Sequence, residues 1–206
     1  MDKKLSPRNT PVQPRARRQR DKILNATSKL LETVGVDELT TIRVAEAVGI
    51  SVGTLYHYFP NKHAILHALA EYWIEDVLAE TQKIADSDLD RLSIKDFVLM
   101  ITNRFEGVYT EHSPLLPQIN VLNTLPELNS LKRHYNKSLL QGFADILIKL
   151  NICDSSPEAE RLATVYCQLL QGLLLPYVDS KVKSDKTLSD IKYLQYSLLE
   201  RAKSNF

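Results

Sequence analysis

The stretch from Thr41 to Lys62 constrains this chain more than any other, because two short apolar patterns meet there around a tight turn. Apolar residues recur at helical spacing over 44–48 and resume over 55–59. Gly49 suits a backbone position with positive φ, since it has no Cβ to clash, and the Ser51 hydroxyl can cap the following helix. The pattern predicts a helix–turn–helix.

The second helix of this motif is predicted over 52–58, after a first helix over 41–48, and its outward face suits the major groove of DNA. Its outward side chains are small, hydroxylated or aromatic with a polar tip. Thr and Tyr hydroxyls can donate to phosphates, and the methyl groups of Val52 can contact a thymine methyl. Asn61 can cap a further helix, whose first N–H groups form an anion site together with Lys62.

The sequence GTLYHYFPNK, followed by HAILHAL, resembles the signature of the TetR family of one-component bacterial transcription regulators. The upstream segment ILNATSKLLETVGVDELTTIRVAEAVGIS is similar to the rest of that family's DNA-binding domain, so the resemblance covers about residues 22–70. It implies DNA contacts by motif position. The residues expected to contact phosphates are Thr41, Arg43, Thr54, Tyr58 and Lys62. The residues expected to face base edges or the groove floor are Ser51, Val52, Gly53, Tyr56 and His57, and Arg43 could serve either purpose.

One position departs from the family pattern. Val52 stands where many members carry Lys or a polar residue, so a base preference there does not carry over.

Basic residues are concentrated near the N-terminus, although the net charge of the whole chain is only +1. Residues 1–24 hold eight basic and two acidic side chains, a local charge of +6, which leaves −5 for the rest. Three prolines and the lack of an apolar period predict that residues 1–17 are a disordered basic arm. Such an arm is either a solvated tail or a segment that follows phosphates or enters the minor groove.

The rest of the chain shows helical spacing and no convincing strand, so the predicted fold class is all-α with nine helices in the arrangement of the TetR family. A DNA-binding domain is expected over 18–62, and a helical ligand-binding and dimerisation domain over 63–206. The helices outside the motif are expected at about 18–34, 61–85, 93–111, an irregular stretch between Pro114 and Pro126, 126–150, from Pro157 to a polar loop at 181–186, and 187–203. The helix over 61–85 connects the two domains.

The last two helices are too apolar for the outside of a monomer. Pairing them with their copies would make a four-helix bundle across a two-fold axis, which is also where the TetR family dimerises. The residues expected at this interface are Leu162, Leu169, Leu173, Tyr177, Ile191, Leu194 and Leu198. The alternative is that the eighth helix is the central core helix of a monomer.

Helices four to eight could enclose a cavity for a small-molecule effector. The candidate wall residues are Phe97, Met100, Ile101, Phe105, Tyr109, Ile119, Asn123, Tyr135, Phe143, Tyr166 and Leu170. Aromatic walls with a few polar atoms suit a medium-sized, mostly apolar molecule. The set holds no basic cluster, so a neutral or cationic ligand is favoured over an anionic one. The alternative is that these residues simply fill the core.

The sequence offers no pattern for catalysis, such as a nucleophile elbow or a phosphate loop, so the chain is not expected to be an enzyme. His63, His67 and Glu71 recur every four residues, but this spacing alone is weak evidence for a metal site, and neither a metal nor a cofactor is expected. Cys153 and Cys167 lack metal-ligand spacing and are expected to be reduced core thiols.

The longest apolar run, residues 173–178, is far shorter than the ~20 residues of a membrane-spanning helix. The charged start of the chain also lacks the features of a signal peptide, so a cytoplasmic location without membrane association is expected.

These features together predict a ligand-responsive, homodimeric transcription regulator. The family resemblance implies a repressor that binds a palindromic, double-stranded operator and is released by an effector. The alternative is a helical sensor or interaction protein whose helix–turn–helix no longer binds DNA.

Overall fold

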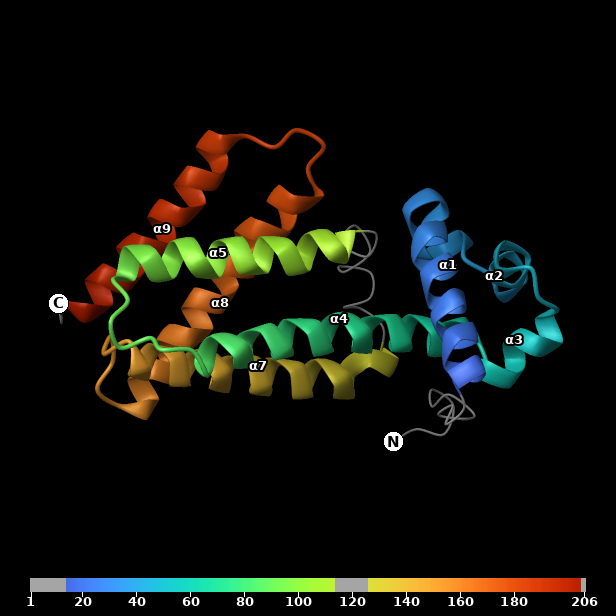
Figure 1. Ribbon diagram of the computed structural model, residues 1–206, viewed down its shortest axis with the longest axis horizontal. Coiled ribbons are helices and arrows are strands. Elements are labelled where there is room, and N and C mark those ends of the chain that lie inside the picture. The colour runs from blue at the N-terminus through green and yellow to red at the C-terminus, as the bar shows by residue number, and fades with distance from the viewer. Residues whose placement is uncertain (1–13, 114–125, 205–206) are drawn as a thin grey trace. The chain divides into compact units, whose positions relative to one another are not determined.

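The computed structural model describes residues 14–113 and 126–204, which are helical and contain no strand (Figure 1). The predicted all-α class is confirmed. The helices are α1 (Pro14–Glu38), α2 (Thr41–Val48), α3 (Val52–Tyr58), α4 (Lys62–Ala85), α5 (Ile94–Glu111), the short 3-10 helix η2 (Pro126–Leu128), α7 (Asn129–Lys149), α8 (Ser156–Asp179) and α9 (Asp185–Lys203). The irregular helix predicted between Pro114 and Pro126, together with Ile119 and Asn123, lies outside the described residues.

The chain divides into two compact units. Of the described residues, unit 1 holds 14–73 and 126–132, and unit 2 holds 74–113 and 133–204. The long helix α4 therefore contributes residues to both units.

In unit 1, α1 begins at Pro14, four residues before the predicted start. The prediction of disorder for residues 1–17 is therefore wrong for residues 14–17, which form the first turn of α1, and residues 1–13 lie outside the description. Proline is tolerated in a first helical turn because its missing N–H would have no partner there. At the other end, Gly35 has a φ of 69° and interrupts the regular helix, at the residue where the sequence predicts its end.

The core of unit 1 is built from the apolar faces of its helices. Ile23 and Leu31 of α1, Val44 of α2, Leu55 of α3 and Phe59 are all completely buried. These positions include the apolar residues whose spacing predicts the helix–turn–helix, and the predicted bounds of α2 and α3 are confirmed. The same apolar side thus holds α3 on the unit and leaves its other side outward.

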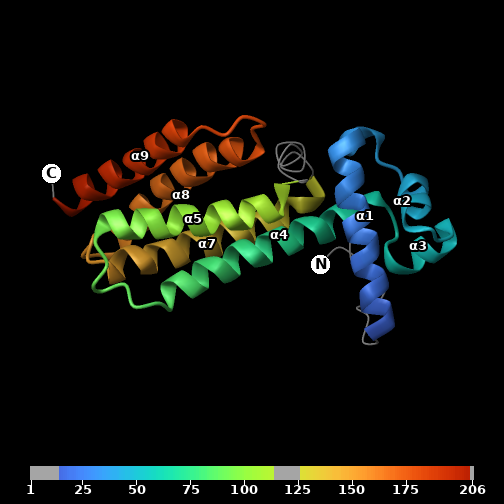
Figure 2. The same ribbon diagram turned by 45° about the horizontal axis from the view of Figure 1, so that its top comes forward.

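In unit 2, α8 and α9 lie side by side with α5, as both ribbon views show (Figures 1 and 2). Where α7 approaches the part of α4 that belongs to unit 2, a Cβ built on Gly142 would come within 2.8 Å of Thr81 Cγ2, so the glycine permits this close approach. No described helix is both long enough and apolar enough to span a membrane.

A buried polar network links the three helices α5, α8 and α9. Gln195 Oε1 accepts a hydrogen bond of 2.7 Å from the Tyr166 hydroxyl, and Gln195 Nε2 donates one of 3.1 Å to Thr102 Oγ1. All three side chains are completely buried. A buried amide that finds these partners avoids the cost of an unmade hydrogen bond, so the network helps to define the register of α9 on its neighbours.

Candidate nucleic-acid interface

The turn between α2 and α3 is a Schellman motif, which sets the direction in which α3 leaves α2. Gly49 lies in the left-handed region (φ 75°, ψ 38°). Its N–H donates to Glu46 O at 3.1 Å, and the Ile50 N–H donates back to Ala45 O at 3.0 Å. These bonds satisfy two carbonyl groups at the end of α2. Because a Cβ at this φ costs about 1–2 kcal/mol, the turn requires glycine, as the sequence predicts.

Side-chain caps begin α2, α3 and α4. Oxygen atoms of Thr40, Ser51 and Asn61 each accept a hydrogen bond from the backbone N–H three residues later, at 3.2, 3.0 and 2.9 Å. A helix of seven residues would not be stable alone, since isolated helices shorter than about 12–15 residues are marginal in water. The cap and the burial of Leu55 therefore both support α3.

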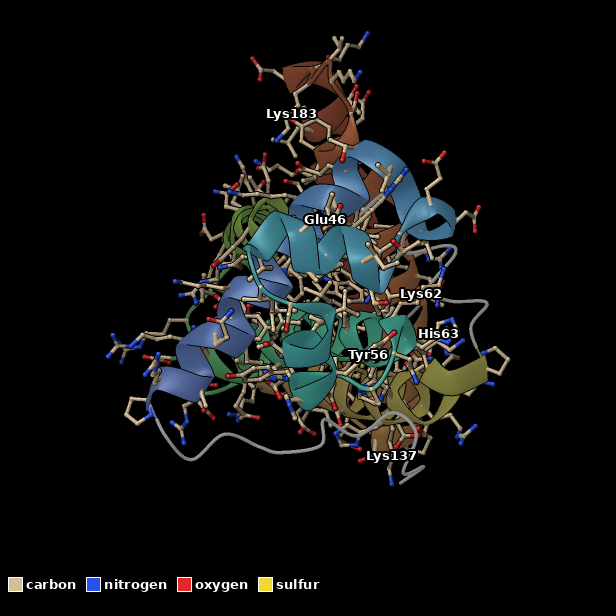
Figure 3. All side chains as sticks on the ribbon, turned by 90° about the vertical axis from the view of Figure 1, so that its right-hand side faces the viewer. Glu46, Tyr56, Lys62, His63, Lys137 and Lys183 are labelled. Atoms are coloured by element: carbon tan, nitrogen blue, oxygen red, sulfur yellow. The ribbon has the colours of Figure 1, made fainter. Side chains whose placement is uncertain are left out.

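The side of α3 away from Leu55 is open to solvent and carries polar groups. Tyr56 is 40% exposed, and His57 is exposed. The hydroxyls of Tyr56 and Thr41 lie 3.2 Å apart, so α2 and α3 together hold the phenol in place. Figure 3 views unit 1 from the side of α2 and α3, with Glu46, Tyr56 and Lys62 labelled. This face offers hydroxyl and imidazole groups of the kind that contact phosphates and base edges.

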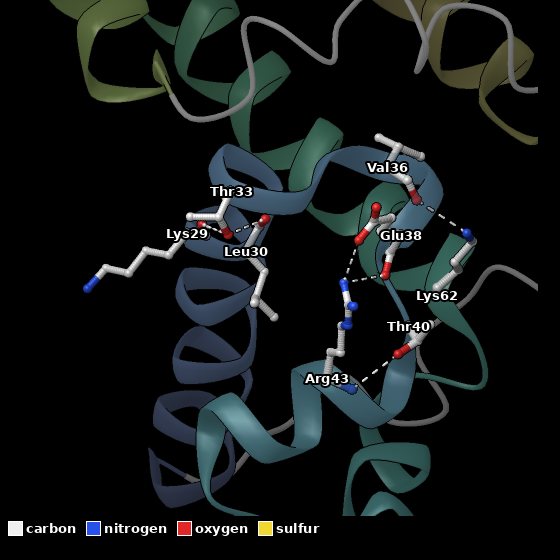
Figure 4. A network of polar contacts seen from close by, with 8 residues as sticks. All are labelled: Lys29, Leu30, Thr33, Val36, Glu38, Thr40, Arg43 and Lys62. Carbon is white, nitrogen blue, oxygen red and sulfur yellow. Dashed lines mark hydrogen bonds and ion pairs between the residues drawn. The ribbon is translucent and has the colours of Figure 1, made fainter.

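Two cations at the edge of this face are bound to the segment that follows α1's interruption at Gly35 (Figure 4). Arg43 Nη1 donates to Glu38 Oε2 at 3.0 Å and to Glu38 O at 3.3 Å, while Lys62 Nζ donates to Val36 O at 3.3 Å. Both partners of the Arg43–Glu38 pair are exposed, so the pair contributes little to stability. A DNA phosphate could replace Glu38 at low cost, because phosphate is a comparable partner for a guanidinium group.

Gly53, in the first turn of α3, has no structural reason to be glycine. A Cβ built there would meet only Ser51 Oγ, at 3.8 Å, and the residue does not have a positive φ. Glycine in a helix costs about 0.5–1 kcal/mol relative to alanine. Close approach of a partner to the start of α3 would account for this residue.

The geometry of this face has a counterpart in known proteins. Residues 23–69 match the family model described as bacterial regulatory proteins, tetR family. Residues 23–69 therefore form a TetR-family domain. The match contains the whole helix–turn–helix, together with the buried residues of α1 that pack beneath it.

Curated proteins similar to this chain include nucleoid occlusion factors. The chain is 32% identical over 102 residues to the nucleoid occlusion factor SlmA of Vibrio atlanticus (strain LGP32), a match that covers 49% of this chain and 50% of that protein. It is 25% identical over 166 residues to SlmA of Idiomarina loihiensis (strain ATCC BAA-735 / DSM 15497 / L2-TR), covering 81% and 82%. The chain spans about half the length of the first curated relatives that it matches.

Solved structures share the fold. Salmonella enterica GusR superposes with a TM-score of 0.70 at 16% identity, covering 93% of this chain and all of that one. A TetR transcriptional regulator from Legionella pneumophila superposes with a TM-score of 0.66 at 14% identity, covering 92% and 98%. The TetR-like fold therefore extends beyond the residues that match the family model. The match of residues 23–69 to a family of regulatory proteins agrees with the prediction that the chain is not an enzyme.

The residues predicted to contact DNA all lie in unit 1, in α2, α3 and the segments that flank α3. Those with exposed side chains or backbone are Arg43, Ser51, Gly53, Tyr56 and His57, and the half-buried ones are Thr41, Val52, Thr54, Tyr58 and Lys62. The fold thus brings them to one small region and leaves each at least partly accessible.

The residues predicted to line an effector cavity are largely core residues of unit 2. Met100 is half-buried, and the other described members of the set are buried: Phe97, Ile101, Phe105, Tyr109, Tyr135, Phe143, Tyr166 and Leu170. Four of them form a chain of ring contacts, with centroid distances of 5.8 Å for Phe105–Phe143, 5.7 Å for Phe143–Tyr166 and 6.3 Å for Phe97–Tyr166. Both readings of these residues, cavity wall and core filling, agree with this packing.

One polar atom in this cluster stands out. The Tyr109 hydroxyl is buried and forms no hydrogen bond within the part of the chain that the structure describes. Burial, and then the neighbouring Tyr135 and Cys167, raise the pKa of Tyr109 well above its usual range, so the phenol is neutral. Burial likewise raises the pKa of the Cys167 thiol to about 12, which keeps it protonated and unreactive. A neutral phenol that has no partner among the described residues is a hydrogen-bond donor available to a ligand.

The residues predicted at the dimer interface fall into two groups. Leu162, Tyr177 and Ile191 are buried in the core of their own unit, so they have little surface to offer a partner. Leu173 and Leu194 are exposed, and Leu169 and Leu198 are half-buried. Val165 on α8 and Tyr193 on α9 are large apolar or aromatic side chains that are also exposed.

Two further sequence readings concern metal and thiol chemistry. No group of three or more His, Cys, Asp or Glu side chains in residues 14–113 and 126–204 is arranged to hold a metal ion. Within the His63–His67–Glu71 series, His67 Nδ1 lies 3.4 Å from Glu71 Oε2, an ordinary helical pair. Cys153 and Cys167 are both buried free thiols, as predicted.

Proposed function

We propose that this chain is a transcription regulator that binds a palindromic operator as a homodimer through α3 and leaves it when a small molecule binds in unit 2. The observation that carries the proposal is the combination of a firmly held α3 and its exposed polar face. A seven-residue helix is capped, anchored by Leu55 and fixed by a Schellman turn, yet its outer face carries exposed polar side chains. The exposed side chains of this outer face lie outside the core of unit 1, and they suit a DNA groove.

The homodimer is supported by the surface of α8 and α9. Val165 is 44% exposed, Leu173 37%, Leu194 47% and Tyr193 67%. Large apolar residues gathered on two adjacent helices are typical of an interface, since monomers rarely expose extended apolar patches. A two-fold pairing of this face would present two copies of α3 to one duplex, from which a palindromic operator follows.

Release by an effector is supported by the interior of unit 2, where the ring of Tyr109 packs against Phe105 and its buried hydroxyl forms no hydrogen bond with the described residues. A ligand there can change DNA affinity only by its difference in affinity between DNA-competent and DNA-incompetent states. An apolar molecule with one hydrogen-bond acceptor matches this lining, because the acceptor would complete the bond that Tyr109 lacks among the described residues.

The DNA-binding part of the proposal is tested by a charge change on α3. His57→Glu is expected to fold normally, because His57 is exposed, and to weaken DNA binding about tenfold or more by placing a carboxylate against phosphates or base edges. His134→Glu makes the same substitution at an exposed position of α7 in unit 2 and serves as the matched control. Equal effects of the two variants in a fluorescence anisotropy assay with genomic DNA fragments would overturn the role of α3.

The second candidate function is that of the relatives named nucleoid occlusion factors. It is favoured by the match to the Idiomarina protein, which covers 81% of this chain and so extends far beyond the DNA-binding domain. A factor that acts on the nucleoid as a whole would bind at many chromosomal sites, whereas an operator-specific regulator binds few. Mapping the bound sites in cells by chromatin immunoprecipitation separates the two functions.

A further inference from the structure

The first turns of α1 carry the densest positive charge in the described part of the chain. Between Pro14 and Lys22, five basic side chains stand against the single carboxylate of Asp21, a local charge of +4 in a chain whose net charge is +1. Arg15, Arg18 and Lys22 are exposed. Figure 3 shows nitrogen-tipped side chains projecting from these turns, beside α3 in the same unit.

The positive charge of these side chains is unfavourable at the N-terminal end of a helix. The N-terminal end of a helix carries a partial positive charge and favours acidic side chains, yet the first turn of α1 contains none. Arg15 and Arg18, as well as Arg17 and Arg20, also stand three residues apart, a spacing at which like charges repel. The sequence therefore places charges here that weaken the isolated helix, which makes sense if a polyanion lies against it when the protein works.

A cation–π contact joins this basic segment to the C-terminal end of α3. The guanidinium carbon of Arg20 lies 5.9 Å from the centroid of the Phe59 ring. Phe59 is the residue that ends α3, and its ring is completely buried. The contact therefore holds the second turn of α1 next to the C-terminal end of α3. The arginines that precede Arg20 lie in the same two turns of α1, within unit 1.

We infer that residues 14–22 form a second phosphate-binding segment, in which the exposed arginines of α1 contact the duplex backbone beside the groove that receives α3. The inference rests on the proposed function, because it assumes that α3 meets DNA. It differs from that proposal in its chemistry: α3 contacts the groove, whereas the basic segment neutralises phosphates and carries no sequence information.

The salt dependence of binding measures such contacts directly, since each neutralised phosphate adds about 0.9 to the slope of log affinity against log salt. The probe is a labelled random-sequence duplex of about 40 base pairs, titrated between about 50 and 200 mM salt. The test variant is Arg15→Gln with Arg18→Gln, because glutamine keeps high helix propensity and both residues are exposed. The control is Lys181→Gln with Lys186→Gln, which removes the same charge from exposed positions of unit 2.

The expected result is a slope reduced by about 1 to 2 for the arginine variant and an unchanged slope for the lysine variant. Amide hydrogen exchange over residues 14–22 is also expected to slow when the duplex is added to the wild-type protein. An arginine variant with the wild-type slope, or a lysine variant with the same loss, would overturn the inference while leaving the role of α3 intact. A wild-type protein that binds neither this duplex nor any genomic DNA fragment would overturn both.

Discussion

Removing the hydroxyl of Tyr109 is expected to make the free protein more stable. Tyr109 is completely buried, and its hydroxyl forms no hydrogen bond with the residues that the structure describes. In the unfolded chain the same hydroxyl bonds to water, so folding leaves it with an unmet requirement. Tyr109→Phe deletes the group and keeps the ring, which packs edge-on against Phe105 at a centroid distance of 5.8 Å.

The size of the effect follows from the cost of burying an unsatisfied donor, about 1–3 kcal/mol. For a chain of this length, 1 kcal/mol shifts the midpoint of thermal unfolding by about 2–4 °C. Tyr109→Phe should therefore raise the midpoint by several degrees, measured by differential scanning calorimetry on the free protein.

Tyr166→Phe is the matched control, because it removes the same atom from an equally buried ring in the same aromatic cluster. The Tyr166 hydroxyl donates a 2.7 Å hydrogen bond to Gln195 Oε1. Its removal leaves the buried amide oxygen poorly satisfied and should lower the midpoint by a similar amount. The same chemical change at these two residues is thus expected to shift the midpoint of thermal unfolding in opposite directions.

A Tyr109→Phe variant that loses stability as Tyr166→Phe does would refute the reasoning, since it would show that the Tyr109 hydroxyl already has a partner. The same variant connects stability to function. If an effector accepts a hydrogen bond from Tyr109, the variant should require a higher effector concentration to release DNA, although it is the more stable protein.

Three further substitutions test packing, electrostatics and assembly. Gly142→Ala should destabilise unit 2 by about 1–3 kcal/mol in denaturant unfolding, because its Cβ would lie 2.8 Å from Thr81 Cγ2. Glu38→Gln should strengthen DNA binding and raise the salt slope by about 1, because Arg43 loses the carboxylate that holds it and becomes available to a phosphate. Leu194→Asp should convert the dimer to a monomer in light scattering, because it places a carboxylate in the apolar α8–α9 face.

Each of these variants has a control at a comparable position. Gly107→Ala should be neutral or stabilising, because a Cβ there meets nothing within 4 Å. Asp37→Asn removes an exposed negative charge adjacent to Glu38, and an equal gain in DNA affinity would show that only net charge matters. Leu99→Asp alters a side chain that is 39% exposed on α5, and loss of the dimer there too would argue against an interface on α8 and α9.

The helix–turn–helix could be predicted from the sequence almost residue by residue because its signals are local. The positive φ at Gly49 and the cap at Ser51 depend only on neighbouring backbone atoms. The residue types at these two positions therefore predict the turn and the start of α3. The start of α1 was predicted too late for a related reason. Pro14 and the arginines that follow it are typical of a disordered segment, but the first turns of α1 accommodate both residue types.

The roles of the apolar residues in unit 2 are harder to predict from the sequence. Helical periodicity identifies the apolar face of a helix, but it does not show whether that face packs in the core, lines a cavity or contacts another chain. Ile191 and Leu194 belong to the same apolar pattern of α9, yet Ile191 is buried within its own unit and Leu194 is 47% exposed. The same limit applies to Tyr109, because its lack of a hydrogen-bond partner among the residues in 14–113 and 126–204 depends on three-dimensional packing. The pairing of Arg43 with Glu38 likewise depends on the backbone reversal at Gly35 and has no local signal.

Hydroxyl-radical footprinting of the protein on DNA fragments selected for binding tests the central claim most directly. The account predicts two protected patches on one side of the duplex, related by two-fold symmetry and about one helical turn, ~34–36 Å, apart or somewhat more. His57→Glu should remove both patches together. A single patch, or two patches that persist unchanged in this variant, would contradict the proposal that two copies of α3 bind successive grooves.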